Sequence, residues 1–218
     1  MSKEFIKRIL SSIILIPLSF YLIIEGSFLF NFFLLICFLL TSFEWFKMSK
    51  NKIYNIFGYI FITFSFYCAY NLRNKFNDES LIIFLLIIIT CISTDIGGYI
   101  FGKIFKGPRL TSISPKKTYS GMLGGYLLSI ITVYIFLNNL YLSSDYFVRF
   151  TYKSLIVVLA ISTVSQIGDI IVSYFKRLSK IKDTGKIIPG HGGILDRIDG
   201  VIFALPFSYI IFSTILIK

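Results

Sequence analysis

The sequence is poor in the side chains that build most metal sites and soluble domains. It contains one histidine, His191, so no second histidine is present for a zinc site. The three cysteines, Cys37, Cys68 and Cys91, lie in apolar runs without metal-ligand spacing, and we interpret them as core or lipid-facing residues. Charged residues make up only 15% of the 218 residues. These shortages argue against a zinc site, a disulfide framework and a soluble domain.

Apolar residues are abundant instead, at 56% of the chain, and several runs have the ~20-residue length that crosses a bilayer. We predict an all-α, polytopic helical membrane protein, because continuous apolar runs do not match the alternating strands of a transmembrane barrel. Residues 1–80 would form a scaffold without a recognisable site, and residues 81–218 a catalytic region with polar loops at 103–120 and 176–199. About seven transmembrane helices are expected, at 9–24, 28–44, 53–70, 81–102, 121–141, 154–175 and 200–217.

Basic residues outnumber acidic ones by 22 to 11, for a net charge of +11. With seven spans, 17 of the 22 basic residues fall on the side of the N-terminus and of both polar loops. The positive-inside rule then predicts a cytoplasmic N-terminus. Attraction of a polyanionic substrate is equally compatible with this charge. Nucleic acid is not an expected partner, because no soluble basic domain is present to bind it.

Two acids, Asp95 and Asp169, lie inside apolar runs. Ionised carboxylates are costly in hydrocarbon, so such residues usually face a polar interior and serve function. Lys103 and Lys176 follow them at the ends of the runs, which places both acids roughly 10–12 Å below the cytoplasmic ends of their helices. We therefore expect both acids to line one pocket open to the cytoplasm. The alternative for each is an ion pair with a basic residue of a neighbouring helix.

The first polar loop, 103–120, combines cations and hydroxyls with turn-forming residues and leads into a helix expected near Gly121. Cations, hydroxyls and free backbone N–H groups at a helix start are typical of a phosphate cradle. The side chains available for it are Ser114, Lys116, Lys117 and Thr118. A loop that is basic only because it is cytoplasmic is the open alternative.

The second polar loop, 176–199, is the densest polar stretch of the chain. Its glycines Gly190, Gly192 and Gly193 suit a backbone packed closely against a ligand, and His191 stands among them. Asp196 and Asp199 lie three residues apart, on one face if the chain from Leu195 onward is helical. Carboxylates without histidine or cysteine partners favour Mg²⁺. Further charges nearby are Asp169, Lys176, Arg177, Lys182, Asp183 and Arg197, the last suited to a phosphate.

These motifs resemble those of the phosphatidate cytidylyltransferases (CDP-diacylglycerol synthases). The similar segments are Asp95-x-Gly97-Gly98-Tyr99-x-Phe101-Gly102-Lys103, Ile113-Ser114-Pro115-Lys116-Lys117-Thr118, Gln166-x-Gly168-Asp169, Ser173-x-x-Lys176-Arg177, Lys182-Asp183-x-Gly185, Ile188-Pro189-Gly190-His191-Gly192-Gly193 and Asp196-Arg197-x-Asp199. They cover about residues 91–210, over half of the chain. In two respects the chain departs from the family: Ser120 stands where members often have an acid, and the N-terminal half is short.

The resemblance implies a multi-pass enzyme of the bacterial inner membrane that converts CTP and phosphatidate into CDP-diacylglycerol and pyrophosphate, with Mg²⁺ as cofactor. The further partners expected are membrane lipids and a second copy of the chain in a homodimer. Asp169, Asp196, Lys176, Arg177 and Lys117 would be catalytic. Asp169, Asp196, Asp199 and Asp183 would bind the metal. Ser114, Lys116, Lys117, Thr118, Lys182, Gly190, His191, Gly192, Gly193, Arg197 and Asp95 would contact the substrates. The alternatives are a CTP-dependent enzyme for another lipid phosphate or lipid alcohol, and an ion-coupled transporter.

Overall fold

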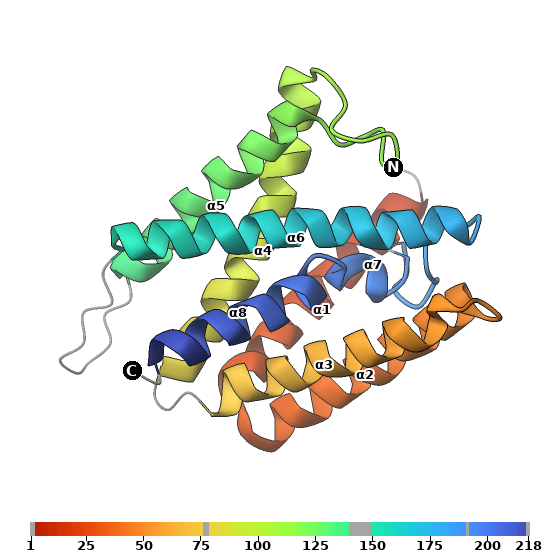
Figure 1. The fold of residues 1–218 in the computed structure, drawn as a ribbon. Helices are drawn as coiled ribbons and strands as arrows, with labels where there is room; N and C mark the ends of the chain where they lie inside the picture. The colour runs from red at the N-terminus through yellow and green to blue at the C-terminus, as the bar shows by residue number, and fades with distance from the viewer. Residues whose placement is uncertain (1–2, 76–78, 140–149, 191, 217–218) are drawn as a thin grey trace.

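The structure is a computed structural model that describes residues 3–75, 79–139, 150–190 and 192–216 (Figure 1). Over these residues it is helical, with seven long helices, one short helix and only two isolated β-bridges, Arg109 to Thr118 and Ile188 to Gly192. The helices are α1 (Lys3–Glu25), α2 (Ser27–Ser49), α3 (Tyr54–Asn74), α4 (Ser80–Phe105), α5 (Tyr119–Asn139), α6 (Tyr152–Leu178), α7 (Leu195–Ile198) and α8 (Val201–Leu216). The all-α prediction is confirmed.

Each of the seven apolar runs corresponds to one long helix, and most of these helices extend a few residues beyond the predicted ends. Both polar loops are therefore shorter than expected, at 106–118 and 179–194. Four helices in the described part of the chain, α2, α4, α5 and α6, are long and apolar enough to cross a membrane. The apolar parts of α1 and α8 are shorter, at Leu10–Glu25 and Val201–Thr214. The fold is thus compatible with a membrane protein, and the count of seven spans stays a prediction.

The helices are arranged as antiparallel neighbours (Figure 1). Helices α2 and α3 form a hairpin, α8 runs back along α6 and also packs on α3, and the α4–α5 pair crosses α6. The turn between α2 and α3, the 179–194 loop and the start of α8 all lie at the same end of the molecule, on the right in Figure 1. Segments far apart in sequence therefore meet at this end.

Helices α4 and α5 approach each other through glycines. A Cβ atom on Gly121 would lie 2.7 Å from the carbonyl oxygen of Gly98, and one on Gly97 would collide with the backbone of Gly124. Small residues let helix backbones come this close, which is common in membrane bundles. The close packing fixes where α4 ends and α5 begins, and so positions the 106–118 loop between them.

An aromatic cluster joins three helices at the loop end of the molecule. Trp45 of α2 packs edge-on against Phe175 of α6 with ring centroids 5.3 Å apart, and Tyr54 of α3 lies 4.9 Å from the same ring. The Trp45 indole nitrogen also donates a hydrogen bond to the carbonyl oxygen of Asn55 at 3.0 Å. Aromatic pairs of this geometry add stability beyond the area they bury. They hold the ends of α2 and α6 in register beside the polar loops.

Candidate functional site

At the loop end of the molecule, one buried lysine bridges two carboxylates. Lys176 Nζ lies 3.0 Å from Asp196 Oδ1 and 3.7 Å from Asp199 Oδ2, and the side chains are 10%, 6% and 11% exposed. Lys176 comes from the last turn of α6, Asp196 from the short helix α7, and Asp199 from the residue that follows α7. The prediction that Asp196 and Asp199 share one face is confirmed. We call these three residues the buried cluster.

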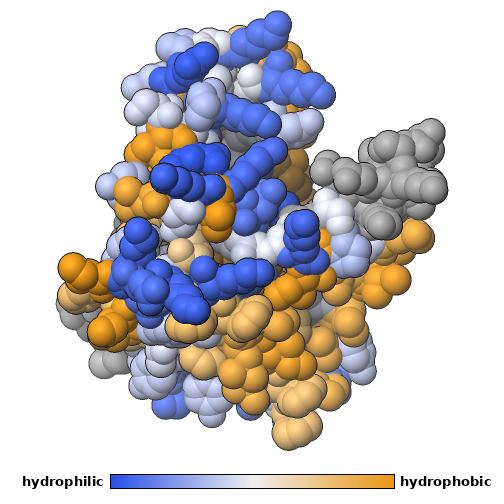
Figure 2. Space-filling model, turned by 90° about the vertical axis from the view of Figure 1, so that its right-hand side faces the viewer, coloured by the Kyte–Doolittle hydropathy of each residue, from blue (hydrophilic) through white to orange (hydrophobic). Residues whose placement is uncertain are grey.

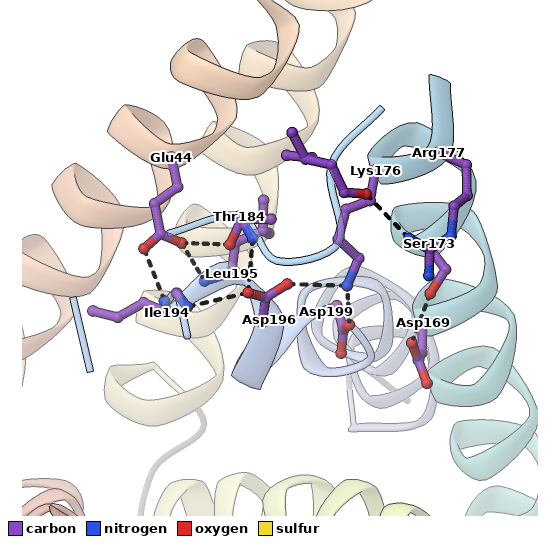
Figure 3. A network of polar contacts seen from close by, with 12 residues as sticks. Glu44, Asp169, Ser173, Lys176, Arg177, Thr184, Ile194, Leu195, Asp196 and Asp199 are labelled. Atoms are coloured by element: carbon purple, nitrogen blue, oxygen red, sulfur yellow. Dashed lines mark hydrogen bonds and ion pairs between the residues drawn. The ribbon is translucent and has the colours of Figure 1, made fainter. Parts of the chain in front are cut away.

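Asp196 is also bonded to the backbone of the 179–194 loop (Figure 3). Its Oδ2 accepts hydrogen bonds from the amides of Thr184 at 2.8 Å and Gly193 at 3.1 Å. Hydrogen bonds from backbone amides to a carboxylate are among the stronger ones in proteins. Three of the positions at which this carboxylate accepts a bond are therefore taken by the protein itself, so Asp196 organises the loop as well as pairing with Lys176.

The structure adds a residue that sequence analysis missed, Glu44 of α2. Its side chain is 1% exposed and points from α2 into the 179–194 loop (Figure 3). Its Oε1 accepts a hydrogen bond from the Ile194 amide at 3.0 Å, and its Oε2 accepts from the Leu195 amide at 2.8 Å and from Thr184 Oγ1 at 2.9 Å. The one sequence signal was an acid near the end of an apolar run, the same signal that identified Asp95 and Asp169.

A second lysine–carboxylate pair lies between the 106–118 loop and α6. Lys117 Nζ is 2.6 Å from Asp169 Oδ2, with side chains 21% and 30% exposed. Ser173, one turn along α6, donates to Asp169 Oδ1 at 3.4 Å. Asp169 therefore makes an ion pair, as in the alternative, although the partner lies in the 106–118 loop and not on a neighbouring helix. Its partner is Lys117, which the sequence had placed in the same site.

The two pairs are close enough to influence each other's charge. Burial raises the pKa of Asp199 well above the usual carboxyl range, and the negative charge of Asp169 raises it further, while Lys176 lowers it. Asp95 on α4 is exposed at the protein surface and feels the charges of Asp169, Lys117 and Arg197. The three acids Asp95, Asp169 and Asp199 thus belong to one electrostatic neighbourhood. That Asp95 and Asp169 line one pocket open to the cytoplasm stays a prediction.

The 106–118 loop is a compact turn structure. Leu110 and Lys117 are joined by a backbone hydrogen bond of 2.8 Å, and the Lys117 amide donates to the Ser114 carbonyl oxygen at 3.0 Å. Thr118 Oγ1 accepts from the Gly121 amide at 3.1 Å, so the threonine caps the first turn of α5. Ser120, where the family often has an acid, donates to the Lys106 carbonyl oxygen. Lys116 is exposed in this loop.

Several other predicted residues lie at the edge of this neighbourhood. Lys182, Asp183 and Arg197 are exposed, and Arg177 donates from Nη1 to the Ile181 carbonyl oxygen at 3.1 Å, which closes the turn after α6. His191 lies outside the described residues. Gly190 and Gly192 have φ angles of 77° and 90°, which favour glycine.

The structure gives a packing reason for the glycine at position 193, and its predicted contact with a ligand stays a prediction. A Cβ atom on Gly193 would collide with Thr184 and Glu44, and one on Gly185 would lie 2.6 Å from Glu44 Oε1. Both glycines therefore make room for the buried glutamate. Gly190 and Gly192 form the tight turn closed by the hydrogen bond from the Ile188 amide to the Gly192 carbonyl oxygen at 2.9 Å.

Among the residues that the structure describes, no three His, Cys, Asp or Glu side chains lie close enough to hold a metal ion by themselves. The donor chemistry nevertheless fits Mg²⁺, which binds oxygen and commonly uses one or two carboxylates together with substrate phosphates and waters. Carboxylate oxygens of the kind that such an ion binds are present at Asp169, Asp196 and Asp199.

The surface around the loops is hydrophilic. Figure 2 views the molecule from the loop end, and hydrophilic residues cover much of this face above an apolar flank. The exposed cations of the two loops and adjoining helix ends include Lys103, Lys106, Arg109, Lys116, Arg177, Lys180, Lys182, Lys186 and Arg197. An anionic, water-soluble ligand would therefore meet a cationic surface next to apolar helix sides.

Fold and site together define a helical protein of membrane type with lysine–carboxylate pairs beneath cationic loops. Residues 56–215 match the cytidylyltransferase family, which is most of the chain, so the protein belongs to that family. The phosphatidate cytidylyltransferase of Rickettsia bellii (strain RML369-C) is 34% identical over 209 residues, covering 94% of this chain and 89% of the relative. That of Rickettsia felis (strain ATCC VR-1525 / URRWXCal2) is 35% identical over 208 residues, covering 94% and 90%. That of Staphylococcus haemolyticus (strain JCSC1435) is 42% identical over 117 residues, covering 52% and 42%.

Proposed function

We propose that this protein is an enzyme that transfers the cytidylyl group of CTP to phosphatidate, giving CDP-diacylglycerol and pyrophosphate. The family match and the shared name of the relatives support this proposal. The observation that carries it is the pairing of Lys176 and Lys117 with carboxylates beneath a cationic surface, at the end of apolar helices. Such a place offers cations to two phosphate-bearing substrates, one from water and one from the lipid phase.

The chemistry needs little beyond charge neutralisation and positioning. A phosphate oxygen of phosphatidate forms a bond to the α-phosphorus of CTP, and the bond from that phosphorus to the bridging oxygen breaks, so pyrophosphate leaves with the electron pair. A lipid phosphate is already a competent nucleophile near neutral pH, so no serine or cysteine nucleophile is required. Lysines that neutralise the approaching anions and hold them in line would lower the barrier.

Of the two paired lysines, Lys117 is the better candidate to contact a phosphate during the reaction. It is more exposed than Lys176 and lies in a loop beside further exposed cations. Substrate phosphate can replace the Asp169 carboxylate as its partner without opening the helix packing. Lys176 holds its two acids in place and contributes a fixed positive charge. Ser114 and Thr118 remain candidates to bind the triphosphate.

When bound, Mg²⁺ would neutralise charge on the triphosphate and the leaving pyrophosphate. Asp169 and Asp199 would hold it, because Asp169 is partly exposed and Asp199 lies farther from Lys176 than Asp196 does, at 3.7 Å against 3.0 Å. Asp196 is the weaker candidate, since the amides of Thr184 and Gly193 already bond to one of its oxygens. Asp183 is exposed and could join only from the edge of the site.

We also propose seven transmembrane spans in a bacterial inner membrane, with the N-terminus and both polar loops in the cytoplasm, where CTP is found. The excess of basic residues in these loops supports that orientation. A homodimer stays a prediction.

The decisive test is product formation by purified protein in detergent. With CTP, phosphatidate and Mg²⁺ we expect CDP-diacylglycerol and pyrophosphate in equal amounts, and little product after chelation. Other lipid phosphates and lipid alcohols, assayed in parallel, address the alternative of a related CTP-dependent enzyme. Turnover of one of these in place of phosphatidate would contradict the proposed substrate, and activity retained in excess chelator would contradict the Mg²⁺ requirement.

A further inference from the structure

Glu44 is an ionisable residue at an unexpected place. It belongs to α2, outside the segments that resemble the family motifs, and lies five residues before the end of that helix. Its side chain is almost fully buried, at 1% exposure. A buried carboxylate is expensive unless its oxygens are hydrogen-bonded, so its surroundings must supply donors.

All of the hydrogen bonds described for Glu44 come from the 179–194 loop and the first residue of α7. The amides of Ile194 and Leu195 stand at the start of α7, where a helix leaves N–H groups without intrahelical partners. Thr184 adds its hydroxyl from 10 residues earlier in the chain. One side chain of α2 thus ties both ends of the glycine-rich segment together.

The contacts continue from Glu44 to the buried cluster. Thr184 bonds to Glu44 through its hydroxyl and to Asp196 through its amide. Asp196 pairs in turn with Lys176, which is also near Asp199. Figure 3 shows this sequence of contacts from Glu44 across Thr184 and Asp196 to Lys176. The position of the two acids therefore depends on a residue that lies outside their own loop.

The glycines of the loop match this arrangement. Neither Gly185 nor Gly193 can carry a side chain without meeting Glu44. The loop backbone thus lies against the carboxylate on two sides. Because a glutamine has only one carbonyl oxygen, it would accept the bonds on one side and present N–H donors to the amide on the other.

We propose that Glu44 is a positioning residue for the reaction, acting through Thr184 and the start of α7 to hold Asp196, and through it Lys176, in the productive geometry. This inference rests on the proposed function for its kinetic readout. The hydrogen bonds described for Glu44 go to Thr184 and to the amides at the start of α7, so Glu44 acts on the lysines through other residues. The charge and both oxygens of the carboxylate are required, because three donors converge on them.

The test compares Glu44→Gln with a matched control in the same helix, Thr41→Val. Thr41 lies three residues before Glu44, is fully buried and has an Oγ1 atom without a hydrogen-bond partner among the described residues. Both full-length variants are purified in detergent, and the folded fraction is measured by thermal unfolding. Steady-state kinetics then give kcat and KM for CTP and phosphatidate, at a temperature where each protein is fully folded.

For Glu44→Gln we expect kcat per folded molecule to fall by about tenfold or more, because the displaced Asp196 and Lys176 would no longer stabilise the transition state. Glu44→Asp, which keeps the charge, should recover part of the loss, and Thr41→Val should retain wild-type kcat. A purely structural role predicts a lower melting temperature with unchanged kcat per folded molecule. That result, or an equal loss of kcat in Thr41→Val, would overturn the proposal.

A second measurement separates this inference from the proposed function. Limited trypsin digestion at the exposed Lys182 and Lys186 reports on the 179–194 loop without any substrate. We expect faster cleavage there in Glu44→Gln and wild-type cleavage in Thr41→Val. If the wild-type protein makes no CDP-diacylglycerol, the proposed function fails, and the cleavage rates still decide whether Glu44 holds the loop. Equal cleavage in all three proteins would contradict the inference by itself.

Discussion

The two lysine–carboxylate pairs of this protein have the same chemistry and opposite surroundings. In the buried cluster, Lys176 and its two acids are at most 11% exposed, and Asp196 is bonded to backbone amides as well. Lys117 and Asp169 are 21% and 30% exposed, and one of the partners belongs to a loop. The first arrangement is enclosed by the protein, whereas the second is partly open to solvent.

This difference predicts different roles for the two groups in folding and in catalysis. Breaking a buried pair leaves a charge without a partner in a poorly solvated place, which costs far more than breaking an exposed pair. The buried cluster should therefore be needed for folding and for catalysis together. The Lys117–Asp169 pair should be needed for catalysis much more than for folding. Three substitutions test the comparison.

The largest effect is expected from Lys176→Met, which leaves Asp196 and Asp199 without their shared cation. We expect the free energy of unfolding to fall by about 3–5 kcal/mol, with loss of product formation. Thermal unfolding in detergent and the CTP assay measure the two effects. Lys153→Met, at an exposed position in the first turn of the same helix, is the control and should change neither. A stable but inactive Lys176→Met protein would show that the cluster does not support the fold.

A different outcome is expected from Asp169→Asn. The Lys117–Asp169 pair is partly exposed, so its loss should cost only about 1 kcal/mol of stability and the melting temperature should change little. Product formation should nevertheless fall by about 100-fold or more, because a proposed metal ligand and the partner of Lys117 are lost together. Raising the Mg²⁺ concentration should not restore the rate. A variant with near-normal activity would remove Asp169 from the site.

The smallest effect is expected at Ser120, which donates to the Lys106 carbonyl oxygen and lies 3.0 Å from Thr118 Oγ1. Ser120→Ala should lower the free energy of unfolding by about 0.5–1.5 kcal/mol, the usual contribution of one hydrogen bond. We expect activity within about twofold of wild type, since the loop keeps its backbone bonds. A loss as large as that of Asp169→Asn would place Ser120 among the residues that contact substrate.

The regular part of the fold was predictable, because long apolar runs have no other stable form in a bilayer than a helix. The pairing of residues was not. Lys117 and Asp169 are 52 positions apart, and only the packing of α5 against α6 brings them to 2.6 Å. Glu44 was missed for the same reason: its partners Thr184 and Ile194 lie 140 and 150 positions away. Periodicity and spacing describe neighbours along the chain, whereas these contacts cross between helices.

The sequence alone established the helical class, the two polar loops and the resemblance of their motifs to one family, since composition, run length and local motifs are properties of the chain itself. Tertiary structure alone decided which charge meets which. It placed Asp196 and Asp199 beside Lys176 and paired Asp169 with Lys117. It also packed Glu44, from the N-terminal helices, against the glycine-rich loop. The physical reason is that a charge acts through distance and burial, and both are set only when the helices pack.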